Sequence, residues 1–295
     1  MDSKPRERAI NYDFPLCSAA FRPTRNCVKL SGLLPTRKQK AMAKVALVTG
    51  AAKRIGFAIA ECLGEHGYSC LIHSKAAHVD EAQAAVARLK KKQIAAAVVL
   101  GDLADPAAAK TIIADAAKPF GPLDLLVNSA AIFEEDSAYA VKLDVWEGAF
   151  GVNLRAPILL AQHFVAQVPE GNEASIVNII DQRVLKPNPQ FFSYSLSKAA
   201  LYFATKTMAQ AFAARNIRVN GIGPGPVLPN TPQGEDGFAE EVAGLPLKHA
   251  VTPQEIAAAV FYLAEARSVT GQMIAVDAGQ HLAWETPDIV KSPRG

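Results

Sequence analysis

The feature that most constrains this chain is a regular alternation, from Lys44 onward, between short β-branched runs and Ala-rich segments of helical length. Repeated strand–helix units predict a parallel sheet with helices on both faces, because a helix returns the chain to the same end of the sheet before each new strand. Strands are expected at 45–49, 69–73, 95–100, 123–128, 174–180, 217–222 and 273–277, and helices at 55–66, 80–92, 106–118, 141–167, 194–214 and 253–264. The pattern predicts a single doubly wound α/β domain.

Two helix starts and one loop can be placed from single residues. Asp105-Pro106 and Thr252-Pro253 each put a capping side chain before a proline, which suits the first position of a helix. The stretch from Gly221 to Pro246 is rich in Gly and Pro, so a mobile substrate loop is expected over about 224–250, near a site.

The first 42 residues differ from the rest in charge and in pattern. They hold nine Lys and Arg against three Asp and Glu, whereas the whole chain of 295 residues has a formal net charge of only +3. The remainder is therefore net acidic and has no basic stripe for nucleic acid. Because 1–42 shows no strand or helix period and Met42 leads directly into the first strand, we expect a disordered or non-native extension before a folded domain at 43–295.

Several function classes are disfavoured by what the sequence lacks. No run approaches the roughly 18 apolar residues that cross a membrane. The four cysteines form no CxxC pair and the histidines show no metal-ligand spacing, so neither disulfides nor a metal site are expected. A cytoplasmic protein that acts on a small molecule is the simplest interpretation.

A glycine-containing turn follows the first predicted strand. The sequence TGAAKRIG, residues 49–56, leads directly into the first helix. Glycine in such a turn lets the backbone approach a pyrophosphate, and the N-terminus of the helix presents unpaired N–H groups to it. A turn of this composition between a strand and a helix predicts a dinucleotide site.

The end of the second strand indicates which dinucleotide binds. It reads His73-Ser74-Lys75, without the Asp or Glu that would hold the ribose 2′-hydroxyl of NAD. A cation and a hydroxyl suit a 2′-phosphate, and Lys53 and Arg54 in the first turn add positive charge. NADP(H) is therefore the expected cofactor.

A candidate catalytic pair lies at the start of the long helix predicted at 194–214. Tyr194 and Lys198 are one turn apart on the same face, and the ammonium is expected to lower the pKa of the phenol toward working pH. The hydroxyl could then donate a proton to a substrate. Asp181 directly follows a strand, at the carboxyl edge where open α/β sheets bind ligands, and the amide of Asn153 could complete a proton path.

From about Lys44 to Trp284 the chain resembles the short-chain dehydrogenase/reductase family. The resemblance rests on an ordered set of motifs: TGAAKRIG, Asp102 in GDLAD, NSAA at 128–131, Asn153, YSLSK at 194–198 and GPGPV at 223–227. It implies a Rossmann-type three-layer fold, a homotetramer or homodimer, and a reductase in which Tyr194 donates the proton and Lys198 also binds the nicotinamide ribose. It also implies that Asp102 receives the adenine and that Asn153 completes the relay. The residues expected to bind the cofactor are Gly50, Lys53, Arg54, Ile55, His73, Ser74, Lys75, Asp102, Leu103, Asn128, Ser129, Ala130, Lys198, Pro224, Gly225 and Val227.

Departures from the usual family pattern bear on the substrate. Asp181 replaces the usual catalytic Ser or Thr, Arg54 replaces the central glycine of the first motif, and Phe133 follows the fourth strand. Together they resemble the pteridine reductase branch, which includes dihydropteridine and dihydromonapterin-type reductases, although Ala131 lacks a hydroxyl that contacts the pterin in some of them. An aromatic ring can stack on a flat heterocycle and a carboxylate can accept from its N–H groups. Arg54, Phe133, Asp181 and Tyr194 are therefore the expected substrate-binding residues.

The expected reaction is NADPH-dependent reduction of a C=N bond in a pterin or dihydropterin, with Tyr194 and Asp181 supplying the proton at nitrogen. One alternative is a carbonyl or 3-oxoacyl reductase in which Asp181 stands in for the hydroxyl. A second is a dinucleotide-sensing protein without catalysis, which would be expected to have lost Tyr194 or Lys198.

Overall fold

The predicted strands form one parallel sheet in the order β3-β2-β1-β4-β5-β6-β7. The computed structural model describes residues 43–229 and 234–284. The expectation of a disordered or non-native extension at 1–42 concerns residues outside these ranges. The strands are β1 (Val45–Val48), β2 (Ser69–Ser74), β3 (Ala96–Leu100), β4 (Leu125–Asn128), β5 (Ala174–Ile179), β6 (Ile217–Pro224) and β7 (Met273–Val276). This arrangement confirms the predicted doubly wound α/β fold.

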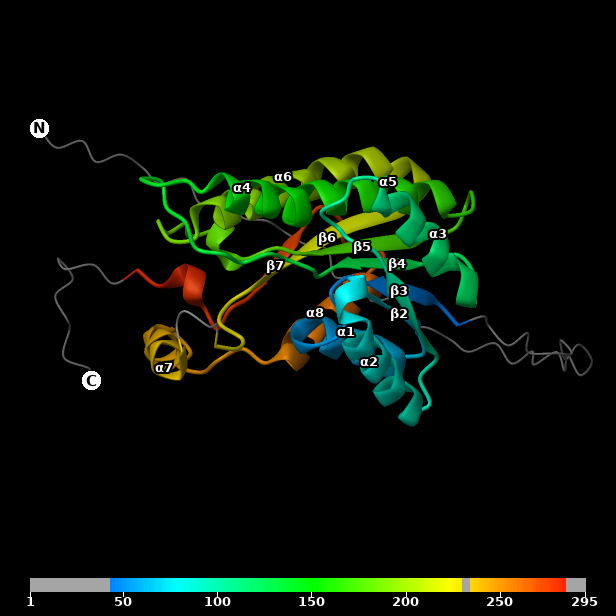
Figure 1. Ribbon diagram of the computed structural model, residues 1–295, viewed down its shortest axis with the longest axis horizontal. Coiled ribbons are helices and arrows are strands. Elements are labelled where there is room, and N and C mark those ends of the chain that lie inside the picture. The colour runs from blue at the N-terminus through cyan, green and yellow to red at the C-terminus, as the bar shows by residue number, and fades with distance from the viewer. Residues whose placement is uncertain (1–42, 230–233, 285–295) are drawn as a thin grey trace, which may run out of the picture. The chain divides into compact units, whose positions relative to one another are not determined.

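Helices cover both faces of the sheet (Figure 1). One layer holds α1 (Arg54–Glu65), α2 (Val79–Lys91) and α8 (Pro253–Glu265); the other holds α3 (Ala108–Phe120), α4 (Leu143–Phe150), α5 (Ala156–Gln167) and α6 (Phe192–Phe212). Alternation along β1 sends Ala46 and Val48 into the core under the first layer, and Val45 and Leu47 into the core under the second. Because both faces are covered, the strand is apolar at every position, as buried parallel strands are.

The chain reverses direction across the sheet between β1 and β4. After β1 it proceeds to β2 and β3 on one side, and β4 then pairs with the other side of β1. Thr49, at the end of β1, accepts hydrogen bonds from the backbone N–H groups of Ser129 (2.9 Å) and Ala130 (3.0 Å), which follow β4. Ligands of open α/β sheets bind at such a reversal, outside the carboxyl ends of the strands.

Two local predictions about helices need correction. Asp105 does not cap a helix at Pro106: its carboxylate accepts from the N–H of Ala107 (2.9 Å) within a turn, and α3 begins only at Ala108. The stretch predicted at 141–167 is not one helix, because a π-helical segment, Gly151–Arg155, separates α4 from α5. The cap at Thr252 is confirmed, since it forms a reciprocal capping box with Glu255 at the start of α8.

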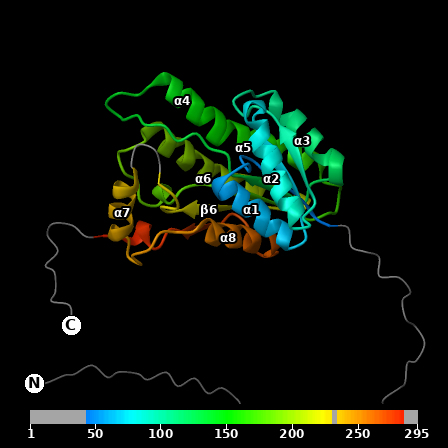
Figure 2. The same ribbon diagram turned by 60° about the horizontal axis from the view of Figure 1, so that its bottom comes forward.

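The loop predicted over about 224–250 contains a helix, α7 (Gly234–Gly244). Acidic residues in its first turn, Glu235 and Asp236, are favourable at a helix N-terminus. This signal was missed because the surrounding sequence is rich in Gly and Pro, which are typical of loops. The side chain of Gln280 donates to Glu241 (2.8 Å), so α7 is held to the segment that follows β7. Figure 2 shows the helix beside that segment, at the end of the sheet.

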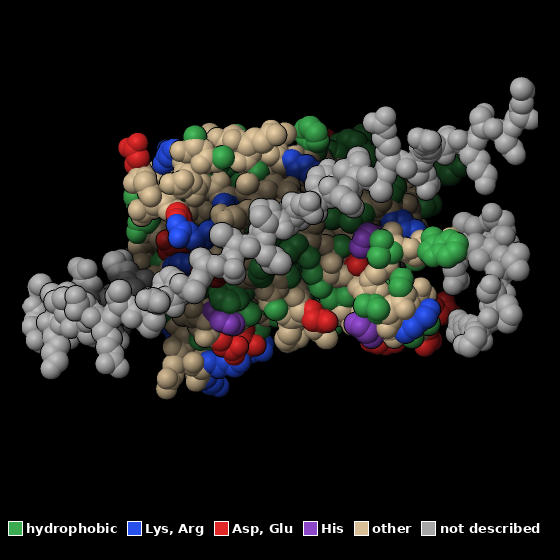
Figure 3. All heavy atoms as spheres, turned by 180° about the vertical axis from the view of Figure 1, so that it is seen from behind, with side chains coloured by type: hydrophobic (Ala, Val, Ile, Leu, Met, Phe, Trp, Pro, Cys, Tyr) green, Lys and Arg blue, Asp and Glu red, His purple; other side chains and the backbone are tan. Residues whose placement is uncertain are grey.

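On the part of the surface left uncovered in Figure 3, Lys and Arg side chains are interspersed with Asp and Glu and do not gather in one stripe. Within residues 43–229 and 234–284, no helix is both long and apolar enough to cross a membrane.

Candidate active site

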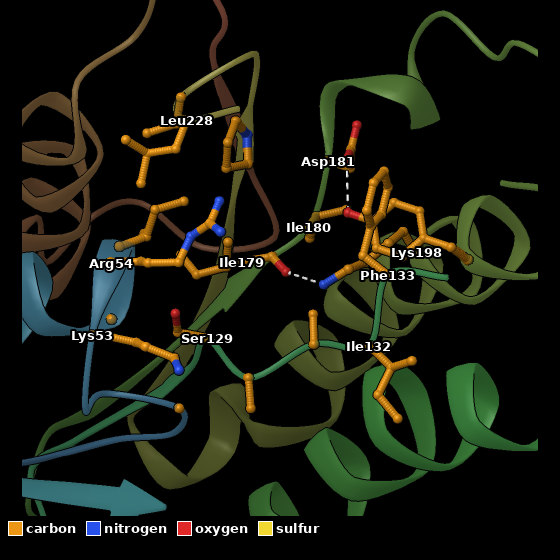
Figure 4. Close-up of a pocket in the computed structure, with 18 of the residues that line it drawn as sticks. Lys53, Arg54, Ser129, Ile132, Phe133, Ile179, Ile180, Asp181, Lys198 and Leu228 are labelled. Carbon is orange, nitrogen blue, oxygen red and sulfur yellow. Dashed lines mark hydrogen bonds between the residues drawn. The ribbon is translucent and has the colours of Figure 1, made fainter. Parts of the chain in front are cut away.

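A cavity of about 790 Å³ opens at the carboxyl ends of the central strands. Figure 4 shows Lys53, Arg54 and Leu228 on one side of it, with Phe133, Asp181 and Lys198 on the other. Most residues predicted from the sequence line this cavity: Gly50, Lys53, Arg54, Ile55, His73, Ser74, Lys75, Leu103, Ser129, Ala130, Phe133, Asp181, Tyr194, Lys198, Pro224, Gly225 and Val227. The structure therefore brings together residues from seven segments of the chain, as the motifs predicted.

The turn after β1 has no room for a side chain at its first glycine. Gly50 has a φ of +63°, and a Cβ added there would lie 2.9 Å from the Cα of Ala130. A Cβ on Gly56 would lie 2.5 Å from the carbonyl oxygen of Gly50. The side chain of Lys53, which precedes α1, makes no capping hydrogen bond. The first N–H groups of α1 are therefore left for a ligand such as a phosphate.

Arg54 adopts a left-handed conformation, with a φ of +54°, although it is not glycine. It is the first residue of α1, and Figure 4 shows its side chain across the cavity from Asp181 and Lys198. Such a φ is costly for a residue with a Cβ and is retained most often at functional sites.

His73 has a different role from the cations next to it. Its ring is buried, and this burial lowers the pKa of the imidazole to about 4, so the ring is neutral near pH 7. Nδ1 accepts a long hydrogen bond from the N–H of Gly50 (3.4 Å), while Nε2 contacts the carbonyl oxygen of Gly101 (3.2 Å). His73 therefore braces the first turn and contributes no charge to it.

The exposed cations near the first turn are partly neutralised. Lys75 forms an ion pair with Asp102 (3.3 Å), and Lys53 pairs with Glu81 (3.0 Å). A hydrogen bond from the N–H of Ala104, followed by the contact with Lys75, lowers the pKa of Asp102. Asp102 lies beside the cavity and does not line it, whereas Glu81, in α2, lines it and was not predicted.

Tyr194 and Asp181 form a hydrogen-bonded pair. The hydroxyl of Tyr194 donates to Oδ2 of Asp181 (2.7 Å), and Oδ1 accepts from the N–H of Arg183 (2.8 Å). Burial raises the pKa of Asp181, although Arg183, Tyr194 and Lys198 oppose that rise. Burial, followed by the charge of Asp181, also raises the pKa of Tyr194 well above its usual value.

The expected lowering of the Tyr194 pKa by Lys198 is therefore wrong for this arrangement. Nζ of Lys198 lies 5.7 Å from the centre of the phenol ring and donates to the carbonyl oxygen of Ile179 (2.7 Å). Burial lowers the pKa of the Lys198 ammonium itself to about 8. Burial of the phenol, followed by the carboxyl next to its hydroxyl, raises the pKa of Tyr194, and the more distant ammonium does not reverse this rise.

Aromatic rings lie next to the Tyr194–Asp181 pair. Phe133 stacks on Phe191, with ring centres 4.1 Å apart and planes at 19°, and meets the ring of Tyr194 edge to face at 4.6 Å. Phe191 precedes α6 in a left-handed conformation, with a φ of +54°. The buried carboxylate of Asp136 accepts from the N–H and the hydroxyl of Ser193, which fixes the loop after β4 to the start of α6.

Two predicted asparagines lie away from the cavity. Asn128 is buried and donates to Asn178 (2.8 Å). It does not line the cavity, contrary to the expectation that it borders the cofactor. Asn153, in the π-helical segment, accepts from the N–H of Ile132 (2.8 Å) and donates to the Ile132 carbonyl (2.9 Å) and to Ser197 (3.1 Å). Its amide therefore holds the backbone next to Phe133 against α6 and bonds the residue before Lys198. The expected proton path through Asn153 stays a prediction.

Other cavity residues were missed by the sequence interpretation. They include His78, Glu81, Gln182, Arg183, Leu228, Phe238, Glu241 and Gln280. Gln182 and Arg183 directly follow Asp181, so their place in the sequence was a usable signal. Phe238 and Glu241 lie on α7, which was expected to be a loop without a helix.

Comparisons with known proteins agree with this geometry. A family model described as Enoyl-(Acyl carrier protein) reductase matches residues 50–281. FolM alternative dihydrofolate reductase 1 from Brucella canis, complexed with NADP, has a TM-score of 0.80 and 46% sequence identity, covering 84% of this chain and 98% of that chain. Blue fluorescent protein from a metagenomic library, in complex with NADPH, has a TM-score of 0.75 and 34% identity, covering 80% and 97%. The 3-oxoacyl-[acyl-carrier-protein] reductase FabG of Staphylococcus epidermidis is 30% identical over 245 residues, 82% of this chain and 100% of that protein.

Proposed function

Because this chain belongs to the short-chain dehydrogenase/reductase family, an oxidoreductase family, we propose that it reduces a C=N bond of a pterin or dihydropterin with NADPH. The observation that carries this proposal is the hydrogen bond of 2.7 Å between the Tyr194 hydroxyl and Asp181. In most of the family, as the sequence resemblance implies, a Ser or Thr occupies the place of Asp181. A carboxyl group can receive N–H groups of a heterocycle, which a ketone substrate does not offer.

The residues at the first turn fit NADP(H). The close approach of Gly50 to Ala130 leaves bare backbone at the turn, and the start of α1 can hold a pyrophosphate. Lys53, Arg54 and Lys75 also line the cavity, and their cationic groups suit a 2′-phosphate, although Glu81 and Asp102 neutralise part of the charge of the two lysines. The FolM structure from Brucella canis, at 46% identity, contains NADP, which supports the same cofactor here.

NADPH, when bound, would supply a hydride to the carbon of the C=N bond. The nitrogen must gain a proton, and the Tyr194–Asp181 pair holds one at the cavity wall. The Tyr194 hydroxyl gives its proton to the nitrogen, and the carboxyl of Asp181 replaces it. The raised pKa of Asp181 favours this role, because the carboxyl stays protonated at a higher pH than an ordinary aspartic acid does.

The aromatic residues fit a flat substrate. Phe133 lines the cavity next to Tyr194, and its stack with Phe191 fixes the orientation of its ring. A fixed ring can pack against a heterocycle beside the nicotinamide. Homo-oligomerisation, which the family resemblance implies, and a cytoplasmic location are part of the same proposal.

A second candidate is reduction of a carbonyl group, as in a 3-oxoacyl thioester. The FabG relative, at 30% identity over its full length, favours it. In that reaction the protonated carboxyl of Asp181 would donate a hydrogen bond to the ketone oxygen, whereas in the C=N reaction it restores the proton of Tyr194.

The test is a comparison of NADPH oxidation by the purified full-length chain with a dihydropterin, with dihydrofolate and with a 3-oxoacyl thioester. Turnover of the pterins with a kcat/KM at least ten times that of the thioester is expected. Turnover of the thioester alone would overturn the proposal in favour of the second candidate.

A further inference from the structure

The two residues after Asp181 turn toward the same cavity. Asp181 ends the extended segment after β5, and its carboxylate accepts from the N–H of Arg183 (2.8 Å), capping a short 3₁₀ turn, Gln182–Val184. This capping fixes the direction of the turn, and both Gln182 and Arg183 line the cavity wall next to Asp181.

The guanidinium of Arg183 lies beside the aromatic stack. Its central carbon is 5.5 Å from the centre of the Phe133 ring and 5.1 Å from that of Phe191, while the two ring centres are 4.1 Å apart. The nearly equal distances place the cation alongside the pair, since a cation beyond one ring would lie much farther from the other. Arg183 is therefore oriented by an aromatic stack in which one ring, that of Phe133, lines the cavity.

Within residues 43–229 and 234–284, Nη1 of Arg183 is buried and has no hydrogen-bond partner. Oε1 of Gln182 is buried and unpartnered in the same part of the chain. A buried polar atom without a partner is strongly unfavourable, and a guanidinium N–H more so than a neutral group. An unpartnered donor and an unpartnered acceptor thus belong to consecutive residues on one cavity wall.

Other arginines of this chain satisfy their guanidinium groups within the protein. Arg155, Arg215 and Arg218 donate to backbone carbonyl oxygens at distances of 2.5–3.0 Å. Arg183 lies at the cavity, and its guanidinium makes no such bond among the described residues. A leucine or methionine could pack on the two rings equally well, so packing alone does not explain why this residue is an arginine.

We infer that Arg183 is a specificity-determining residue whose guanidinium binds an acceptor oxygen of the substrate, with Gln182 accepting from a neighbouring N–H group. This inference rests on the proposed function and deepens it. The wall Asp181–Gln182–Arg183 offers two acceptors and one donor, which complements the edge of an amino-oxo heterocycle. The acceptor oxygen is either the ring carbonyl or a carboxylate on the substrate's side chain.

The test compares three variants of the full-length enzyme: Arg183→Met, Arg183→Lys and Arg88→Met. Arg88 is a matched control, because its guanidinium lies 3.9 Å from the ring of Phe57, away from the cavity. For each protein, KM and kcat are measured with a dihydropterin that has an uncharged side chain and with dihydrofolate, and the Kd of NADPH is measured by fluorescence. The dependence of kcat/KM on pH is recorded as well.

Arg183→Met is expected to raise KM at least tenfold, with kcat and the Kd of NADPH within threefold of wild type, because a hydrogen bond to a charged group is lost. Arg183→Lys should recover part of the loss, and Arg88→Met should match wild type. Loss with both substrates assigns the ring carbonyl, and loss with dihydrofolate alone assigns the side-chain carboxylate.

A KM for Arg183→Met within twofold of wild type on both substrates would overturn the inference while leaving the proposed function intact. A shift of the pH profile with KM unchanged would overturn it also, because Arg183 would then act only through the charge of Asp181. No turnover of any pterin by wild type would instead overturn the proposed function, and this inference with it.

Discussion

The substitution Lys198→Met is expected to abolish activity and, near neutral pH, to leave the protein at least as stable as wild type. Burial lowers the pKa of Lys198 from 10.5 to about 8, so the charged form is disfavoured in the folded protein by about 3 kcal/mol, at about 1.4 kcal/mol per pKa unit. Methionine has a similar shape and no charge to bury. Removing the buried charge should therefore stabilise the folded variant, and the loss of the hydrogen bond to the Ile179 carbonyl offsets about 1–3 kcal/mol of that stabilisation.

The dependence on pH isolates the titration of Lys198 from these other effects. The pKa of Lys198 is depressed in the folded state, so its contribution to stability is fully present above pH 10.5 and is lost as pH falls through about 8. Between pH 7.5 and 9.5 this group alone should raise the free energy of unfolding of wild type by about 2 kcal/mol. Lys198→Met should lack this component.

The assay is urea unfolding of both proteins without cofactor at pH 7.5 and 9.5, followed by circular dichroism. The quantity of interest is the change in the difference between wild type and variant over this pH range, since all other titrating groups cancel. A difference that stays constant within about 0.5 kcal/mol would refute the conclusion that the Lys198 ammonium is destabilised by burial.

Three further predictions concern the same site. Tyr194→Phe should lower kcat at least a hundredfold and leave the Kd of NADPH within threefold, by steady-state kinetics and fluorescence titration, and an unchanged kcat would contradict its role as proton donor. Gly50→Ala should lower the free energy of unfolding by about 1–3 kcal/mol and weaken NADPH binding, because φ is +63° and the added Cβ would lie 2.9 Å from Ala130; a variant as stable as wild type would contradict this. The pKa of His73 is depressed from 6.5 to about 4, so between pH 7 and pH 4 wild type should lose about 3 kcal/mol more stability than His73→Gln; equal losses would argue against a buried neutral ring.

The sheet and most of the cavity could be predicted because they depend on local and repeating signals. Periodicity located every strand of the sheet, and the motif around Gly50 and the spacing of Tyr194 and Lys198 identified opposite sides of one cavity. Strand ends of a parallel sheet meet at one edge, so residues that directly follow strands, such as Asp181, could be brought together by topology alone.

What could not be predicted depends on contacts between distant segments. Spacing on a helix brings Lys198 close to Tyr194, but only the folded structure shows that burial of the phenol, followed by its hydrogen bond to Asp181, raises the pKa of Tyr194. The amide of Asn153 is directed to Ile132 by a local π-helical turn, which has no strong sequence signal. The helix α7 was hidden by neighbouring Gly and Pro residues.

The proposal that Asp181 directs this reductase toward C=N bonds is tested most directly by the variant Asp181→Ser. The measurement is the ratio of kcat/KM for a dihydropterin to kcat/KM for a 3-oxoacyl thioester, in wild type and in the variant. The ratio should fall at least tenfold in Asp181→Ser, because serine keeps a donor for a ketone oxygen and loses the carboxyl that receives N–H groups and replaces the proton of Tyr194. A ratio that is unchanged or increased in the variant would contradict the account.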